Sequence, residues 1–447
     1  MPRRGRYSRE DLIRSDDLPF TPGRMVRLPA RFDNQVEKEV WMSHLADPSI
    51  PKILDLFCGA GGLSEGFVSA GFTVAAALDH DVDACQTYAA NLPARVIHTD
   101  IAAIADPTMI LEDLPVTAID AIVGGPPCQG FSVVGKARIS KLDEENKLVL
   151  LARNELYQHF FRFIEAFHPA FFIMENVPTL LTYKEEAYIK AIQQECERLR
   201  YALTYKVIDA ADYGVPQVRR RLFLIGSRLG WLFRWPRPIS EGKPVPLQDA
   251  IGDLPKVLPP SLEEILPYYP DSPLSDYQRF MRSHVDPDNK HVIYDHVVRP
   301  VREDDKQVFL QMKPGDRYSD IDPRFQRYNP ETFRDKYYML KPDAPGVTIT
   351  AHLAKDGYRY IHWDREQHRT ISVREAARIQ SFGDHFRFAG SRSARFRQIG
   401  NAVPPLLAEQ LGEQVRLALR RRMGELGPVQ LGLPGYEHLS KLAVSSQ

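Results

Sequence analysis

The chain has 447 residues, of which 43% are hydrophobic and 26% are charged, so it can bury a large core and divide into two domains. Its 58 basic and 58 acidic residues cancel, and we therefore expect a polyanionic partner to bind a local basic surface. No apolar run approaches the roughly 20 residues of a membrane helix, and the polar N-terminus lacks the hydrophobic stretch of a signal peptide.

The first fifty residues form a basic N-terminal arm (1–50) whose structure the pattern does not define. From 51 to 240, short apolar runs alternate with longer amphipathic ones. We expect buried strands at 52–57, 72–79, 118–125, 170–176 and 221–227, with helices between them. This alternation is typical of an α/β fold with a doubly wound, mostly parallel, Rossmann-like sheet.

The pattern changes after about residue 240. Residues 241–371 are rich in proline and aperiodic, so a second, smaller and irregular domain is predicted there. Helical patterning returns within 372–425, and 426–447 form a tail. The four cysteines and the dispersed histidines lack the spacing of a metal site, so we expect no metal and a reduced, cytoplasmic protein.

Polar residues and glycines follow successive predicted strands. Gly59, Gly61 and Gly62 lie in "DLFCGAGGLSEGF", where the first strand turns into a helix and glycine lets a ligand approach the backbone. Asp79 ends the second strand, and Asp100 follows the next apolar stretch. Because ligands of open α/β sheets bind at the carboxyl ends of the strands, we expect these turns to converge on one nucleoside. For each acid alone, a loop carboxylate or a helix cap is an equal alternative.

A second group of residues could carry chemistry at the same edge. Cys128 stands in the stiff turn "GGPPCQGFS" (124–132), and Glu175 ends a buried strand. A thiol and an acid beside a nucleoside site indicate covalent catalysis on a flat electrophile. Arg219 and Arg221 alternate along a predicted strand and would share one face, although a solvated strand face is the usual explanation of such a pair.

These motifs resemble those of the DNA (cytosine-5) methyltransferases of bacterial restriction-modification or phage-defence systems. Between about residues 52 and 425, five of them occur in the family's order: "DLFCGAGGLSEGF", "PPCQGFS", "ENV", "QVRRR" and "RQIGNAVPP". The resemblance implies transfer of a methyl group from S-adenosyl-L-methionine, leaving S-adenosyl-L-homocysteine, to C5 of a flipped-out cytosine in a short specific sequence of double-stranded DNA.

The resemblance also implies residue roles. Cys128 would add to cytosine C6, and Glu175 would supply a proton or a hydrogen bond at N3. Arg219 and Arg221 would contact O2 and hold the catalytic residues. The implied cofactor contacts are Phe57 on the adenine, Asp79 on the ribose, Asp100 on the adenine amine, and also Cys58, Gly59, Ala60, Gly61, Gly62, His80, Ile101, Pro127, Leu156, Asn401 and Val403. The sequence departs from the family at Asp79, where glutamate is common, and at His80, where an aromatic residue is common.

For DNA, the resemblance makes 132–148 a loop that closes over the flipped base, and 241–345 a target-recognition region. The predicted DNA contacts are Gln129, Ser132, Lys136, Arg138 and Gln217. We expect double-stranded DNA, a cognate nuclease or defence proteins as partners, and a monomer.

Three alternatives stay open from the sequence. A tRNA cytosine-5 methyltransferase would share the proline-cysteine turn but needs less base-reading surface than 241–345 offers. A catalytically silent DNA-binding module would not need Cys128, Glu175, Arg219 and Arg221 together. A nicotinamide dehydrogenase would explain the glycines but not the Pro127–Cys128 turn.

Overall fold

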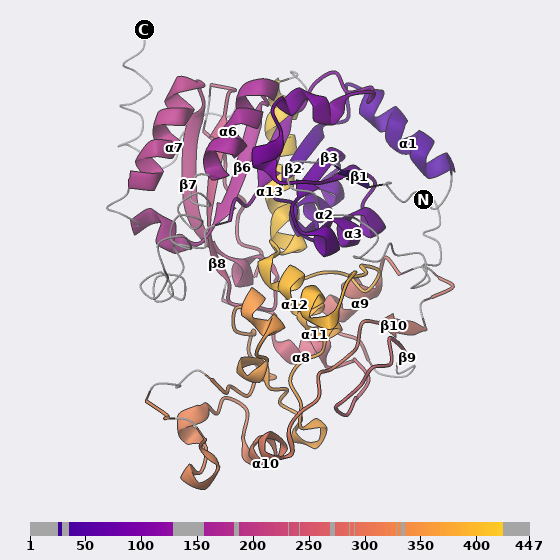
Figure 1. The fold of residues 1–447 in the computed structure, drawn as a ribbon, viewed down its shortest axis with the longest axis vertical. Coiled ribbons are helices and arrows are strands. Elements are labelled where there is room, and N and C mark those ends of the chain that lie inside the picture. Colours follow the sequence, from indigo (N-terminus) through magenta and orange to yellow (C-terminus); the bar gives the residue numbers. More distant parts are fainter. Residues whose placement is uncertain are drawn as a thin grey trace.

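The computed structural model describes residues 26–28, 35–127, 156–182, 187–230, 232–240, 242–268, 273–285, 287–289, 291–327, 329–331 and 336–422. Figure 1 shows a sheet flanked by helices in the upper part of the molecule and a second lobe of short elements below it. The chain passes from the sheet lobe into the second lobe and then returns through a long C-terminal helix. No helix among the described residues is long and apolar enough to cross a membrane.

The sheet has eight strands in the order β1-β4-β3-β2-β5-β6-β8-β7. Strands β4, β3, β2, β5 and β6 pair in parallel, whereas β1 and β8 run antiparallel to their neighbours. The strands are Val26–Leu28 (β1), Lys52–Leu56 (β2), Thr73–Asp79 (β3), Arg95–His98 (β4), Ala121–Gly124 (β5), Phe171–Asn176 (β6), Ala202–Asp209 (β7) and Arg220–Ser227 (β8). The predicted α/β fold with a mostly parallel sheet is confirmed.

The burial of each strand follows its place in the sheet. Every residue of β2 and β3 is buried, because both strands are central and covered on both faces. The edge strand β7 has two exposed residues in the sequence ALTYKVID, and neither β7 nor the three-residue strand β1 was predicted from the sequence.

Helices cover both faces of the sheet, as expected. One face carries α2 (Gly62–Ser69), α3 (Val82–Asn91) and α13 (Pro405–Arg422), whose buried residues join those of the strands in one apolar cluster. The other face carries α1 (Gln35–Ala46), α6 (Leu156–Phe167) and α7 (Ala187–Arg198), which form a second cluster. The sheet lobe therefore includes the C-terminal helix, far along the chain from the first strand (Figure 1).

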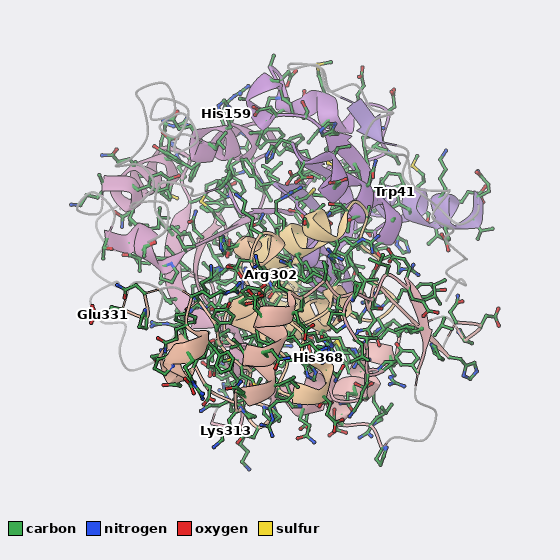
Figure 2. The ribbon with its side chains drawn as sticks, turned by 60° about the horizontal axis from the view of Figure 1, so that its bottom comes forward. Trp41, His159, Arg302, Lys313, Glu331 and His368 are labelled. Carbon is green, nitrogen blue, oxygen red and sulfur yellow. The ribbon has the colours of Figure 1, made fainter. Side chains whose placement is uncertain are left out.

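Among its described residues, the second lobe contains short helices and a two-stranded antiparallel sheet. Its elements are α8 (Leu247–Ile251), β9 (Ile265–Pro267), α9 (Asp276–Arg282), β10 (Val292–Tyr294), α10 (Glu303–Gln311), α11 (Val373–Ile379) and α12 (Arg392–Asn401). Figure 2 brings this lobe forward, with Arg302, Lys313, Glu331 and His368 spread over it, whereas Trp41 and His159 belong to the sheet lobe.

Buried ion pairs hold the short elements of the second lobe together. The guanidinium of Arg378 donates to Asp253 Oδ1 at 2.5 Å and to Asp384 Oδ2 at 2.6 Å, and none of the three side chains is more than 2% exposed. Arg369 pairs with Glu375 in the same way at 2.7 Å. Removing one partner of such a pair would leave a buried charge uncompensated, which costs several kcal/mol (about 3–5 kcal/mol).

Candidate active site

A strained turn of residues 57–62, here called the glycine turn, follows β2 and leads into α2. Phe57 has a φ of 59°, which is unusual for a bulky residue, and Gly61 at the N-cap of α2 has a φ of 96°. The Gly61 N–H donates to the carbonyl oxygen of Cys58 at 2.9 Å and so closes the turn. The N-terminus of α2 starts directly after this turn, where backbone N–H groups without helical partners can bind a ligand.

Asp79, at the end of β3, is tied to this turn. Its Oδ2 accepts the Gly59 N–H at 2.9 Å, and its Oδ1 accepts the Asp81 N–H at 2.8 Å and lies 3.2 Å from His80 Nδ1. Burial alone would raise the pKa of Asp79, but these contacts together outweigh it and hold the pKa below its usual value. Asp79 is therefore an ionised acceptor that fixes the glycine turn.

Asp100 follows β4 at the same edge of the sheet. It is exposed and caps the short helix Ile101–Ala103 (η3), accepting the Ala102 N–H at 2.9 Å. His98 and His80 connect this strand end to that of β3, because His98 Nε2 lies 3.1 Å from the His80 carbonyl oxygen. The ends of β2, β3 and β4 are thus neighbours, as expected, and Asp100 has the helix-cap role considered as its alternative.

Sequence reasoning missed Asp55, an acid inside β2. It is 1% exposed, its Oδ2 accepts the Ser64 Oγ–H at 2.6 Å, and its Oδ1 has no hydrogen-bond partner among the described residues. Burial raises the pKa of Asp55 to about 7. A carboxyl group within the apolar run KILDLF was the signal that could have identified this residue.

The end of β6 places an acid beside an arginine of β8. Glu175 Oε1 lies 2.9 Å from Arg221 Nε, and the two side chains are only 14% and 15% exposed. Gly125 leaves room for this acid, because a Cβ at residue 125 would lie 3.2 Å from Glu175 Oε2. The next residue, Asn176, is buried and donates through Nδ2 to the Pro126 carbonyl oxygen at 3.3 Å.

This last hydrogen bond anchors the turn that leads to the predicted nucleophile. Pro127 is the last described residue before it, and Cys128 lies outside the described residues. Four of the predicted DNA contacts also lie outside them: Gln129, Ser132, Lys136 and Arg138.

Arg219 and Gln217 join the sheet lobe to the second lobe. Arg219 precedes β8, is 1% exposed, and donates to the carbonyl oxygens of Ile349, Gly400 and Ala402 at 2.6, 3.0 and 3.0 Å. Its guanidinium also interacts electrostatically with Arg221 and Glu175, so it lies near that pair. Gln217 is fully buried, and its amide is bonded to Gln380 at 2.6 Å and to the Ile349 N–H at 2.7 Å. A direct contact of Gln217 with DNA would require these hydrogen bonds to break.

The segment RQIGNAVPP (397–405), here called the C-terminal motif, contacts the glycine turn. A Cβ at Gly62 would lie 2.3 Å from the Val403 carbonyl oxygen, so these two backbones are in direct contact. Val403 is buried, whereas Asn401 at the end of α12 is exposed. Phe57 and Leu156 are partly buried hydrophobic residues that pack against the same cluster on the other face of the sheet. Segments from the beginning and the end of the fold therefore meet at one edge.

Comparison with known proteins identifies this arrangement. A family model of C-5 cytosine-specific DNA methylases matches residues 51–416. The chain belongs to this family. It is a DNA cytosine-5 methyltransferase, as its motifs predicted.

Several relatives resemble this methyltransferase over most of its length. The type II methyltransferase M.AgeI of Thalassovita gelatinovora is 34% identical over 444 residues, covering 82% of this chain and 100% of its own. M.DdeI of Desulfomicrobium norvegicum is 34% identical over 387 residues, covering 81% and 88%. Among solved structures, a DNA modification methyltransferase encoded within an E. coli prophage superposes with a TM-score of 0.65 at 26% identity, covering 83% of this chain and 99% of that one.

Proposed function

We propose that this methyltransferase transfers the methyl group of S-adenosylmethionine to C5 of a flipped-out cytosine through a covalent bond between Cys128 and C6. The observation that carries the proposal is the Glu175–Arg221 pair at 2.9 Å, next to the turn that Asn176 fixes and that leads to Cys128. The glycine turn and Asp79 follow β2 and β3 of the same sheet, whose parallel strands end at one edge.

The residues present are suited to the chemistry of the cytosine ring. C5 of cytosine is a poor nucleophile, and formation of a bond between the Cys128 sulfur and C6 moves electron density to C5. Glu175, oriented by Arg221, would hydrogen-bond to N3 or protonate it as negative charge develops there. After methylation, loss of the C5 proton and cleavage of the sulfur–C6 bond would restore the aromatic ring and the thiolate.

The glycine turn and its neighbours fit S-adenosylmethionine, which supplies an electrophilic methyl group on its sulfonium sulfur. Asp79 is ionised and uses three of its acceptor positions within the protein, which leaves capacity for a ribose hydroxyl. Phe57 and Leu156 offer apolar surface for the adenine, and Asp100 retains acceptor capacity for the adenine amine. The Asp79 side chain is short and already engaged, so we expect its ribose contact to be weaker than that of a glutamate.

The second lobe is the proposed reader of the DNA sequence, within a target-recognition domain of residues 241–371. Its short elements expose basic residues such as Lys313 and Arg324, which could contact phosphates. The type II methyltransferases among the relatives support a role in marking self DNA within a restriction-modification or phage-defence system.

The test is methyl transfer from labelled S-adenosylmethionine to unmethylated duplex DNA and, separately, to tRNA, with Cys128→Ala as the control. The proposal predicts label in DNA as 5-methylcytosine and no label with the variant. Label on tRNA alone would assign the protein to RNA, and label on adenine or on an exocyclic amine would rule out the covalent route.

A further inference from the structure

A groove lies on the sheet lobe, apart from the candidate active site. Residues 232–239, here called the strap, follow β8 and run beside the outer face of α13 between Gln410 and Arg421. The strap and the helix enclose a cavity of about 370 Å³. This volume is within the range of sites that bind a few side chains or a small ligand (roughly 300–1,000 Å³).

The strap is anchored along its length, so the groove is a built feature. Phe233 is buried and packs edge-on against Phe171 of β6, with ring centroids 6.3 Å apart. Tyr213 donates its hydroxyl to the Pro236 carbonyl oxygen at 3.0 Å, and the Ile239 N–H donates to the Asp212 carbonyl oxygen at 2.9 Å. These anchors hold the strap in place beside α13.

Most of the groove lies away from the edge of the sheet that carries the candidate active site. Helix α13 begins beside the middle of α2, since a Cβ at Gly66 would meet Pro405 and Glu409, and it then passes Gly71 near Arg416. It therefore runs parallel to α2, away from the glycine turn. Arg421 and Leu417 lie toward the opposite edge of the sheet, so their side chains are available for another function.

The lining combines apolar surface with unpaired positive charge. Trp235, Leu417 and Ala418 form apolar surface, and Leu232 and Ile239 remain 41% and 62% exposed. The three charged residues of the lining are all arginines, Arg234, Arg237 and Arg421. Among the residues that the structure describes, none of these arginines pairs with an acid, and Arg421 Nε is buried without a hydrogen-bond partner.

We infer that this groove binds an acidic peptide segment of a partner protein, with a large apolar side chain of that segment seated between Trp235 and Leu417. Unpaired guanidinium groups favour carboxylates, with which they form bidentate hydrogen bonds. Gln410 and Gln414 add amide donors and acceptors that match a peptide backbone. Duplex DNA would satisfy the arginines but is convex and offers no side chain to fill the apolar cavity, so a peptide fits the whole lining better.

The inference can be tested with a defined probe, the peptide acetyl-DEFDELDE-amide, on the full-length protein. Trp235 lines the groove, so its fluorescence should report binding, and Trp235→Phe should remove that signal. The matched peptide acetyl-DESDESDE-amide keeps every charge and lacks the apolar side chains. We expect the first peptide to bind at least about tenfold more tightly, because it buries apolar surface as well as pairing charges.

Charge reversal then locates the site. Arg234→Glu, Arg237→Glu and Arg421→Glu combined should weaken binding of the first peptide by at least about tenfold, since each exposed pair contributes about two- to fivefold. Lys38→Glu, Arg200→Glu and Lys206→Glu combined, three exposed basic residues of the sheet lobe outside the groove, are the charge-matched control and should leave binding unchanged. Methyl transfer should survive in both proteins. If the triple variant does not fold, Ile239→Glu at the mouth of the groove should weaken binding in the same direction.

Three results would overturn the inference. The two peptides could bind equally, which would mean attraction by charge alone. Binding of the first peptide could survive the reversal of the arginines. Lastly, the reversal could weaken binding of duplex DNA and not of the peptide, which would make the groove a nucleic-acid contact.

Discussion

Gly62 is the point at which the glycine turn and the C-terminal motif are in closest contact. In Gly62→Ala, the new Cβ would lie 2.3 Å from the Val403 carbonyl oxygen and 3.0 Å from Phe382 Cζ, whereas ordinary contact begins near 3.4 Å. The two backbones must therefore separate by about 1 Å. Overpacking of this kind costs about 1–3 kcal/mol of the free energy of unfolding.

The same displacement moves the N-terminus of α2, where the cofactor is proposed to bind. We expect Gly62→Ala to weaken binding of S-adenosylhomocysteine by roughly tenfold or more, equivalent to about 1.4 kcal/mol. The affinity can be measured by titration calorimetry and the free energy of unfolding by urea denaturation.

Gly66→Ala is the matched control, because its Cβ would lie 2.4 Å from Glu409 N and from the Pro405 carbonyl oxygen, one helical turn further from the glycine turn. It should lose similar stability and retain more of its affinity for S-adenosylhomocysteine. Equal losses of affinity in both variants, or unchanged affinity in Gly62→Ala, would refute the reasoning that Gly62 and Val403 shape the cofactor site.

Three further predictions follow from the candidate site. Glu175→Gln removes the carboxylate that Arg221 orients, so methyl transfer should fall by about a hundredfold or more in a single-turnover assay, with unchanged affinity for S-adenosylhomocysteine. Asn176→Ala frees the Pro126 carbonyl oxygen, and the single-turnover rate should fall by roughly fivefold, equivalent to a hydrogen bond of about 1 kcal/mol; an unchanged rate would mean that this bond does not position the turn. The folded-state pKa of Asp55, about 7, lies above its value of 3.8 in the unfolded chain, so its contribution to stability is present at low pH and is lost as the pH rises through 7. Thermal unfolding of Asp55→Asn should therefore show a smaller fall in stability than the wild type between about pH 4 and pH 7, and parallel curves in that window would count against a neutral Asp55.

The central strands could be predicted because they are buried on both faces. In β2 and β3 every residue is buried, so their sequences, KILDL and TVAAALD, are mostly apolar. The edge strand β7 mixes exposed and buried residues, and its sequence resembles that of a loop as much as that of a strand. The site residues at the ends of β2, β3 and β6 could be found for the same reason, since each lies at the end of a recognisable strand or directly after it.

Contacts between distant segments could not be predicted from local patterns. Arg219 donates hydrogen bonds to carbonyl oxygens more than 100 positions away, at Ile349, Gly400 and Ala402, and nothing in the local sequence indicates these partners. The burial of Gln217 against Gln380 depends in the same way on how the second lobe docks. The periodicity of apolar residues predicts which face of a helix or strand a side chain is on. It does not predict which distant segment of the chain will contact that side chain.

The central claim is a covalent bond between Cys128 and C6 of a cytosine in duplex DNA. It is tested most directly with duplexes that carry 5-fluorocytosine within a randomised core, incubated with S-adenosylmethionine. Fluorine replaces the C5 proton that must leave before the sulfur–C6 bond can break, so the enzyme should remain attached to DNA after denaturation. We expect mass spectrometry to show an adduct at Cys128 that requires S-adenosylmethionine and is absent in Cys128→Ala. Methylated DNA without a trapped adduct, or an adduct at another residue, would rule out the Cys128–C6 bond.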